Sequence, residues 1–98
     1  MDDKTRSLAE LFQALGDPNR LGIIKLLMSE PLPLCVNALA RELGISQSAV
    51  SQHLKILRHQ GLVEAKKEGY YKHYTVSVEN LDSVRMLREE VLGDGFAL

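Results

Sequence analysis

The chain has 98 residues, with 12 Lys and Arg against 13 Asp and Glu and a formal net charge of −1 at pH 7. This length suits one domain with a thin hydrophobic core, so we expect residues 1–98 to form a single unit. One cysteine excludes an intrachain disulfide, and the most apolar stretch, residues 21–28, is too short to span a bilayer. The polar start of the chain does not resemble a signal peptide. We therefore expect a cytoplasmic protein with no membrane partner.

Although the net charge is near neutral, basic and acidic residues are distributed unevenly along the chain. Residues 41–73 hold six Lys or Arg against three Glu, whereas the remainder holds six basic and ten acidic residues. This asymmetry favours one basic face on an acidic body, although a chance fluctuation of surface charge would produce the same pattern. A basic face is typical of nucleic-acid binding, since neutralisation of phosphates dominates the affinity.

Two helices are predicted in the first third of the chain. The first, over residues 5–15, ends at Gly16 and carries apolar residues at helical spacing: Leu8, Leu11, Phe12 and Leu15. Asp17 then serves as N-cap of the second helix, and Pro18 occupies its first position, where the missing N–H costs nothing. The buried face of this second helix consists of Leu21, Ile24 and Leu27.

A pair of short helices follows. The first covers residues 37–43 and ends at Gly44, and the second begins after its N-cap Ser46, continues to Gln60 and ends at Gly61. Two short helices joined by a turn of this length and chemistry predict a helix-turn-helix.

The apolar period then changes from helical to alternating. Residues 62–67 and 73–78 are predicted strands, joined by a turn at residues 68–70 in which Gly69 is free to adopt positive φ. A final helix is expected over residues 80–92. The fold class is therefore mainly α with a β-hairpin wing (α+β), a winged helix-turn-helix with the order α-α-α-α-β-β-α.

The first and last helices lie outside the predicted DNA-reading unit, and both have leucine-rich faces larger than a thin core needs. We expect them to pack together and against a second copy, through Leu8, Leu11, Phe12 and Leu15 and through Leu81, Val84, Leu87 and Val91. The alternative is that these faces only cover the core of the single chain.

The helix over residues 47–60 has two distinct faces. Its apolar face consists of Val50, Leu54 and Leu57, and the opposite face holds Gln47, Ser48, Ser51, Gln52 and Lys55. These polar groups lie near the N-terminal end, the part of a recognition helix that enters the major groove and contacts base edges and phosphates. A solvated face is the alternative, but such faces are usually rich in Glu, and no acidic residue occurs between Ile45 and Val63.

The wing supplies further candidates for DNA contact. Lys66, Lys67 and Lys72 with Tyr70 suit phosphate or minor-groove contact, which positions a protein without reading sequence. One of Tyr70 and Tyr71 is expected to pack under the hairpin. His53 lies beside the apolar stripe and either forms a hydrogen bond within the helix-turn-helix or contacts a phosphate.

Three stretches of the sequence resemble the ArsR/SmtB family of regulators. They are residues 14–21 (ALGDPNRL), residues 39–57 with the segment SQSAVSQHL, and residues 61–63 leading into a wing that ends at Tyr74. The resemblance implies a homodimer built on the first and last helices, which binds an imperfect palindromic operator in double-stranded DNA. It also implies a repressor that releases DNA when an inducer binds.

The inducer site is where the sequence departs from this family. Many of its arsenic or cadmium sensors carry a Cys-Val-Cys motif at the third helix, where this chain reads Leu34-Cys35-Val36-Asn37. Others bind zinc or nickel through Asp and His of the last helix, but residues 79–98 contain no histidine. We therefore expect no metal site of the usual kind and no cofactor. Cys35 is either a small structural hydrophobe or a redox sensor, and a small-molecule inducer stays open.

An enzyme is not expected. Ser51 and His53 are two residues apart on one helix and so point to different faces, which excludes a catalytic dyad. The sequence also lacks a Gly-rich phosphate loop, an HExxH motif and a nucleophile elbow. The remaining alternative is a winged-helix module that binds protein instead of DNA, which the near-neutral net charge keeps open.

Overall fold

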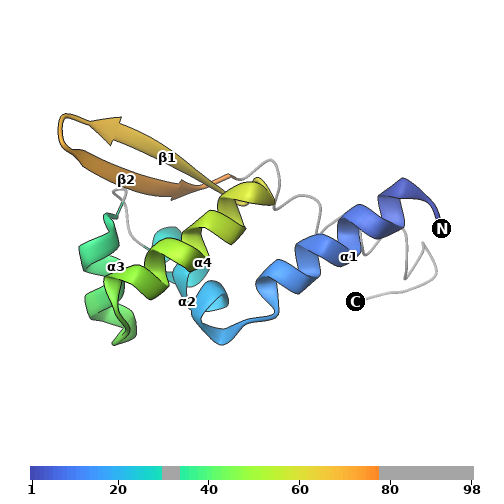
Figure 1. Cartoon of the computed structure of the whole chain (residues 1–98), viewed down its shortest axis with the longest axis horizontal. Helices are drawn as coiled ribbons and strands as arrows, with labels where there is room; N and C mark the ends of the chain where they lie inside the picture. The colour runs from blue at the N-terminus through green and yellow to red at the C-terminus, as the bar shows by residue number, and fades with distance from the viewer. Residues whose placement is uncertain (30–33, 78–98) are drawn as a thin grey trace.

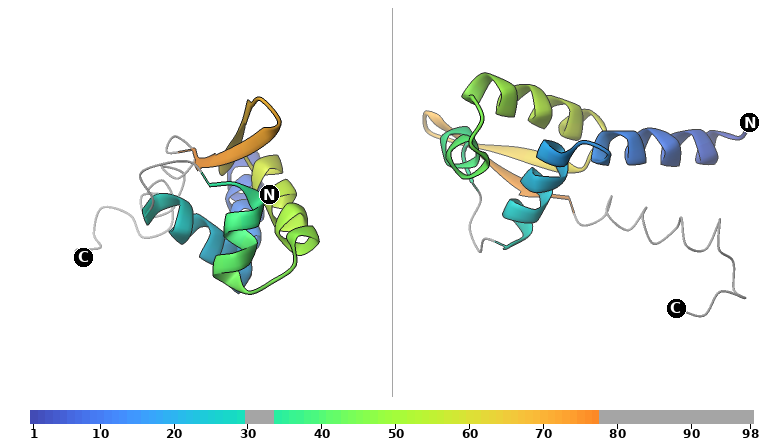
Figure 2. Two further views of the ribbon diagram at one scale, coloured as in Figure 1. Left: turned by 90° about the vertical axis from the view of Figure 1, so that its left-hand side faces the viewer. Right: turned by 90° about the horizontal axis from the view of Figure 1, so that it is seen from below.

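The computed structural model describes residues 1–29 and 34–77. The elements follow in the order α1 (Asp3–Leu15), α2 (Pro18–Ser29), α3 (Val36–Leu43), α4 (Gln47–His59), β1 (Val63–Glu68) and β2 (Tyr71–Val76). The helices α2, α3 and α4 form a body covered on one side by the hairpin, and α1 projects from the end opposite the hairpin tip (Figure 1 and Figure 2). The predicted winged helix-turn-helix is confirmed. The helix expected over residues 80–92 lies outside the described residues.

The N-terminal caps explain where the helices begin. The carboxylate of Asp2 accepts the backbone N–H of Thr5 at 2.6 Å, so α1 begins two residues before the predicted boundary. Asp17 caps α2 as predicted, and its Oδ2 accepts two backbone N–H groups, from residues 19 and 20, at 2.9 and 3.1 Å. Ser46 caps α4 as predicted by accepting the N–H of Ala49 at 3.1 Å. The start of α4 is therefore fixed by one hydroxyl.

Left-handed glycines end the two helices of the helix-turn-helix. Gly44 has φ +68°, and its N–H donates to the carbonyl of Ala40 at 2.9 Å, which closes α3. Gly61 has φ +72° and follows Gln60, which is the C-cap of α4 rather than its last residue. A close approach of α2 and α3 accompanies this turn, because a Cβ added at Gly22 would lie 2.9 Å from Cδ2 of Leu43.

The wing is a two-stranded antiparallel hairpin with a two-residue turn. The register pairs Val63 with Val76 at its base and Glu68 with Tyr71 at its tip. Gly69 has φ +64° at the first central position of the turn, where a type II′ hairpin needs glycine. This tight turn extends β2 two residues toward the tip beyond the predicted boundary, since Tyr71 and Lys72 join the ladder.

One hydrophobic core lies between α2, α3, α4 and the base of the hairpin. Its buried members are Leu11, Ala14, Ile23, Ile24, Leu27, Leu39, Ala40, Val50, Leu54, Leu57, Leu62, Val63 and Tyr74. Side chains from every described element contribute, so the helix-turn-helix and the wing share the same core. Among the described helices, none combines the length and apolarity that a bilayer crossing requires.

The aromatic residue under the hairpin is Tyr74. Tyr70 is fully exposed and Tyr71 is 67% exposed, so the prediction that one of these two packs under the hairpin is wrong. The tight turn places both at the tip, beyond the part of the hairpin that rests on the helices. Tyr74 faces the core instead and is only 7% exposed.

Candidate DNA-binding surface

Helix α4, the second helix of the helix-turn-helix, has one buried and one exposed face. Val50, Leu54 and Leu57 are at most 1% exposed and anchor the helix in the core. The polar residues of the predicted reading face are all exposed: Gln47, Ser48, Ser51, Gln52 and Lys55. No acidic residue occupies the first turn, so nothing there repels a phosphate. The predicted division of this helix is confirmed.

His53 lies apart from that exposed face. Its side chain is 19% exposed, and its Nδ1 lies 3.4 Å from Nη1 of Arg20 and 3.9 Å from Oδ2 of Asp17. Both partners belong to the corner between α1 and α2. The sequence left two roles open for His53, and these contacts favour the structural one.

Arg20 is the centre of this corner. Its Nε donates to the carbonyl of Ala14 at 2.5 Å, and one terminal nitrogen lies 3.5 Å from the carbonyl of Gln13. These carbonyls belong to the last turn of α1, where few backbone donors remain. The carbonyl of Gln13 also accepts the backbone N–H of Gly16 at 3.2 Å, so the contribution of Arg20 is greatest at the carbonyl of Ala14. Sequence reasoning missed this role of Arg20, because the only signal was its place within the family-like stretch at residues 14–21.

The carboxyl group of Asp17 completes the corner electrostatically. Its pKa lies below the usual value of 3.8, first because the backbone N–H of Arg20 donates to the carboxylate. The N–H of Asn19 and the charges of His53 and Arg20 lower the pKa further, and desolvation acts in the opposite direction. The ionised form of Asp17 is therefore the one that fits the folded chain.

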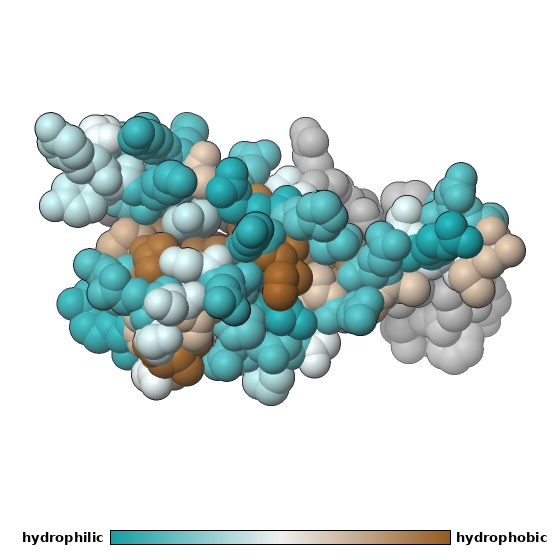
Figure 3. Space-filling model, viewed as in Figure 1, coloured by the Kyte–Doolittle hydropathy of each residue, from teal (hydrophilic) through white to brown (hydrophobic). Residues whose placement is uncertain are grey.

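The cations of the wing lie on both faces of the hairpin. Lys67 pairs directly with Lys72, and Lys66 pairs with His73 on the opposite face. All three lysines are exposed, as is Tyr70 at the tip. Hydrophilic side chains cover the hairpin, and apolar surface appears between it and the helices (Figure 3). The hairpin therefore places cations beside the exposed face of α4.

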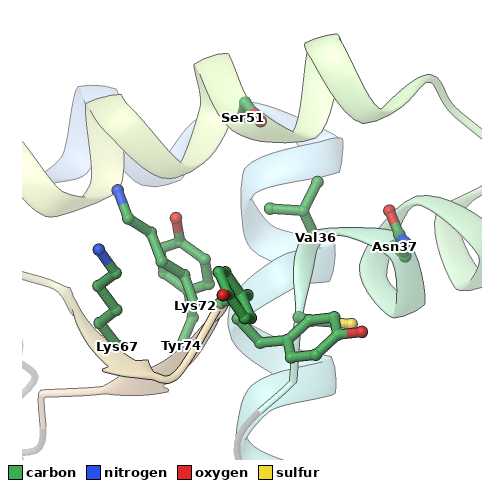
Figure 4. A pocket seen from close by; sticks show the side chains of 9 residues that line it. Val36, Asn37, Ser51, Lys67, Lys72 and Tyr74 are labelled. Atoms are coloured by element: carbon green, nitrogen blue, oxygen red, sulfur yellow. The ribbon is translucent and has the colours of Figure 1, made fainter.

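A cleft of about 590 Å³ separates the wing from the helix-turn-helix (Figure 4). Its lining residues come from the start of α3, from α4 and from the hairpin: Cys35, Val36, Asn37, Ser51, Lys67, Tyr70, Tyr71, Lys72 and Tyr74. None of them is acidic, and two are lysines. The cleft therefore brings together predicted DNA-contacting residues from α4 and the wing.

Cys35 is the N-cap of α3 and is partly exposed at the edge of this cleft. Its side chain forms no capping hydrogen bond. Within residues 1–29 and 34–77, no three His, Cys, Asp or Glu side chains come close enough to hold a metal ion. The described part of the chain thus offers a thiol beside the cleft but no cluster of metal ligands.

Comparisons with known proteins, like the geometry, indicate a DNA-binding regulator. Residues 17–65 match the family described as bacterial regulatory protein, arsR family. An uncharacterized HTH-type transcriptional regulator of Methanocaldococcus jannaschii is 38% identical, covering 91% of this chain and 99% of that protein. The arsenical resistance operon repressor of Escherichia coli is 46% identical over 69% of this chain, which spans 57% of the repressor.

A solved structure supports the same assignment. HlyU from Vibrio cholerae N16961 matches with a TM-score of 0.74 and 33% identity, covering 94% of this chain and 99% of that one. The similarity therefore extends over nearly the whole of both chains and includes the wing. The chain belongs to the arsR family of bacterial regulatory proteins and is a winged helix-turn-helix DNA-binding transcriptional regulator.

Proposed function

We propose that this regulator recognises its operator with the exposed face of α4 and contacts the flanking DNA backbone with the wing. The observation that carries the proposal is the acid-free polar face of α4 beside three exposed wing lysines. Gln47 and Gln52 suit base edges, where the amide of Gln pairs with adenine. The serines and Lys55 add contacts to bases or phosphates, and Lys66, Lys67, Tyr70 and Lys72 contact the backbone.

The reading unit acts as a homodimer in this proposal. The projecting α1 leaves Leu8, Phe12 and Leu15 partly exposed, whereas Leu11 already contributes to the core of the single chain. The partly exposed three pack against a second copy, together with the predicted helix over residues 80–92. A two-fold dimer reads an imperfect palindrome whose half-sites lie about 34–36 Å apart, or a multiple of that distance.

Repression is the regulatory outcome that we propose. A dimer seated on an operator near a promoter excludes the transcription machinery from the same DNA. The E. coli relative is named as a repressor, whereas the V. cholerae relative HlyU is named as a transcriptional activator. A reporter placed behind the chain's own upstream DNA distinguishes the two, because deletion of a repressor raises expression and deletion of an activator lowers it.

Relief of repression requires a signal, and Cys35 is the proposed redox sensor. The thiol is partly exposed, and it lies at the start of α3 beside residues that we place against DNA. A change of size or charge at this sulfur alters that surface directly. A small-molecule inducer is the alternative. If such an inducer is the signal, it would release DNA from a Cys35→Ser variant as fully as from the wild type.

The decisive experiment is a fluorescence titration against the chain's own upstream DNA and a scrambled duplex at two salt concentrations, with sedimentation of the free protein. We expect a dimer that prefers the upstream DNA, with an affinity that falls steeply as salt rises. Binding that is weak, unselective and insensitive to salt would contradict the proposal. That result would instead indicate a module that binds other proteins.

A further inference from the structure

His53 is the one titratable side chain of α4 that is partly buried. Its side chain is 19% exposed, whereas the other basic side chains of this helix are exposed. Nδ1 of its imidazole lies 3.4 Å from Nη1 of Arg20 and 3.9 Å from Oδ2 of Asp17. A single ring nitrogen is therefore within reach of both a permanent cation and a carboxylate.

The contact with Arg20 depends on the protonation state of the imidazole. A guanidinium offers only N–H donors and keeps its charge at all ordinary pH values. Nδ1 of His53 must therefore accept from Arg20, which requires a neutral ring with its proton on Nε2. A second proton, on Nδ1, would turn this acceptor into a donor and place two positive charges about 3.4 Å apart. The Arg20 contact therefore forms only while His53 is neutral.

Asp17 is the acceptor available to a protonated His53. The pKa of Asp17 is lowered, first by the backbone N–H of Arg20, so its carboxyl group stays ionised wherever an imidazole titrates. Within residues 1–29 and 34–77, Asp17 is the only carboxylate at ion-pair distance from the imidazole. Charged side chains on the other elements packed against α4 are exposed, among them Glu10 of α1, Glu42 of α3 and Glu64 of β1. Arg20 and Asp17 thus compete for Nδ1 according to its charge.

The partner of His53 matters because Arg20 also holds the end of α1. Nε of Arg20 donates to the carbonyl of Ala14, so one guanidinium joins α1 to α4 while the imidazole is neutral. In the proposed function, α1 carries contacts between copies and α4 carries contacts with base edges. Loss of the joint leaves α4 less restricted relative to α1. Binding to the operator must then restore an order that the neutral form already has, which costs affinity.

We propose that His53 is a proton-sensitive positioning residue of the DNA-binding surface, an inference that rests on the proposed function. While its imidazole is neutral, Arg20 holds α4 in the orientation that fits the operator. When Nδ1 takes up a proton from solvent, the imidazolium turns to Asp17 and Arg20 releases α4. Because operator binding favours the neutral form, the preference for operator over other DNA falls as the pH falls through the range in which imidazole titrates.

The contact is tested first in the DNA-free protein, by following the side-chain nitrogen resonances of His53 between pH 8 and pH 5. We expect the neutral ring to carry its proton on Nε2, because Nδ1 accepts from Arg20. A neutral ring with its proton on Nδ1 would overturn the proposal whether or not the protein binds DNA. This measurement therefore separates a failure of the inference from a failure of the proposed function.

The second measurement is the ratio of affinities for the upstream and scrambled duplexes at pH 7.5 and pH 5.5. A ratio is used because protons on the other two histidines, His59 and His73, add positive charge that favours both duplexes alike. We expect the ratio to fall about fivefold in the wild type, the scale of one hydrogen bond. It should change little in His53→Gln, whose amide oxygen accepts from Arg20 but takes up no proton. The matched control, His59→Gln on the exposed side of α4, should keep the wild-type fall.

A selective wild type whose ratio does not change with pH would overturn the proposal, as would an equal fall in the wild type and His53→Gln. A wild type without preference for its upstream DNA at pH 7.5 would contradict the proposed function and this inference with it. Thermal unfolding at both pH values checks that each variant is folded. If His53→Gln is not, Arg20→Gln removes the joint at every pH and should show the low ratio throughout, whereas a wild-type pH dependence in that variant would overturn the proposal.

Discussion

The guanidinium of Arg20 lies 3.4 Å from Nδ1 of His53 while it also donates to the carbonyl of Ala14. One side chain therefore joins the last turn of α1 to the middle of α4. In the proposed dimer, α1 carries the contacts between copies and α4 carries the contacts with DNA. Arg20 thus links the helix proposed to dimerise with the helix proposed to contact DNA.

Replacing Arg20 with Lys tests this connection without changing the net charge. A lysine has no planar fork with which to reach the carbonyls and the imidazole together. We expect the free energy of unfolding to fall by about 1–2 kcal/mol, because the partly buried carbonyl of Ala14 at the end of α1 loses a donor. Denaturant unfolding measures the effect, and Lys25→Gln on the exposed side of α2 serves as a control expected to stay within about 0.5 kcal/mol. An Arg20→Lys variant as stable as the wild type would show that the guanidinium of Arg20 adds nothing to the free energy of unfolding.

Stability should fall at low pH in a way that depends on Asp17. Its pKa is lowered in the folded chain, chiefly by the backbone N–H of Arg20, whereas in the unfolded chain it titrates near 3.8. The stabilisation is therefore fully present above pH 3.8 and is lost as the pH falls through the lower folded value. Unfolding midpoints between pH 5 and pH 2 should decline less steeply in Asp17→Asn, which keeps a capping residue but cannot titrate. Parallel curves for the two proteins would contradict this assignment.

How far the sequence predicts the fold depends on whether a signal is local. Ser46 and Asp17 were identified correctly as caps because N-capping depends on a residue and its next three neighbours. The burial of Tyr74 rather than Tyr70 or Tyr71 depends on the hairpin register. A two-residue turn in place of a three-residue one shifts which residues pair, and the alternating pattern alone did not distinguish the two.

The same distinction between local signals and contacts set by the fold applies to the candidate site. The polar face of α4 follows from helical periodicity, so its five residues could be selected from the sequence. The facing of Lys67 and Lys72 depends on the hairpin register, whereas the contacts of His53 with Arg20 and Asp17 join residues far apart in the sequence. Periodicity reports neither a strand register nor a long-range contact, so the sequence leaves two roles open for His53.

Two substitutions should separate sequence reading from general affinity. Gln52→Ala removes an exposed amide from the reading face of α4 and should change which operator bases are preferred. Lys66→Ala removes a cation from the outer face of the wing and should lower the affinity for all duplexes alike. The affinity of this variant should also depend less steeply on salt. Competition titrations with operators mutated one base pair at a time measure both effects. If Lys66→Ala changed base preference and Gln52→Ala did not, the roles given to helix and wing would have to be exchanged.

Alkylation of Cys35 should block DNA binding. The thiol is partly exposed at the edge of the cleft, so a maleimide adduct would occupy space beside Ser51 and the wing lysines. We expect the modified wild type to lose about tenfold or more in affinity, the scale of one good contact to DNA. Cys35→Ser treated with the same reagent should bind as it did before treatment. If wild type whose complete modification is verified by mass spectrometry keeps its full affinity for DNA, Cys35 does not lie beside the bound DNA.

The pairing of Lys67 with Lys72 has a consequence for the free protein as well as for its complexes. Without an anion between them, the two ammonium groups repel each other across the paired strands near the hairpin tip. Added salt screens this repulsion and so tightens the hairpin, while the same salt competes with the regulator for DNA. In the free protein, amide hydrogen exchange at the hairpin tip should therefore slow as salt is added, although the same salt weakens binding to DNA.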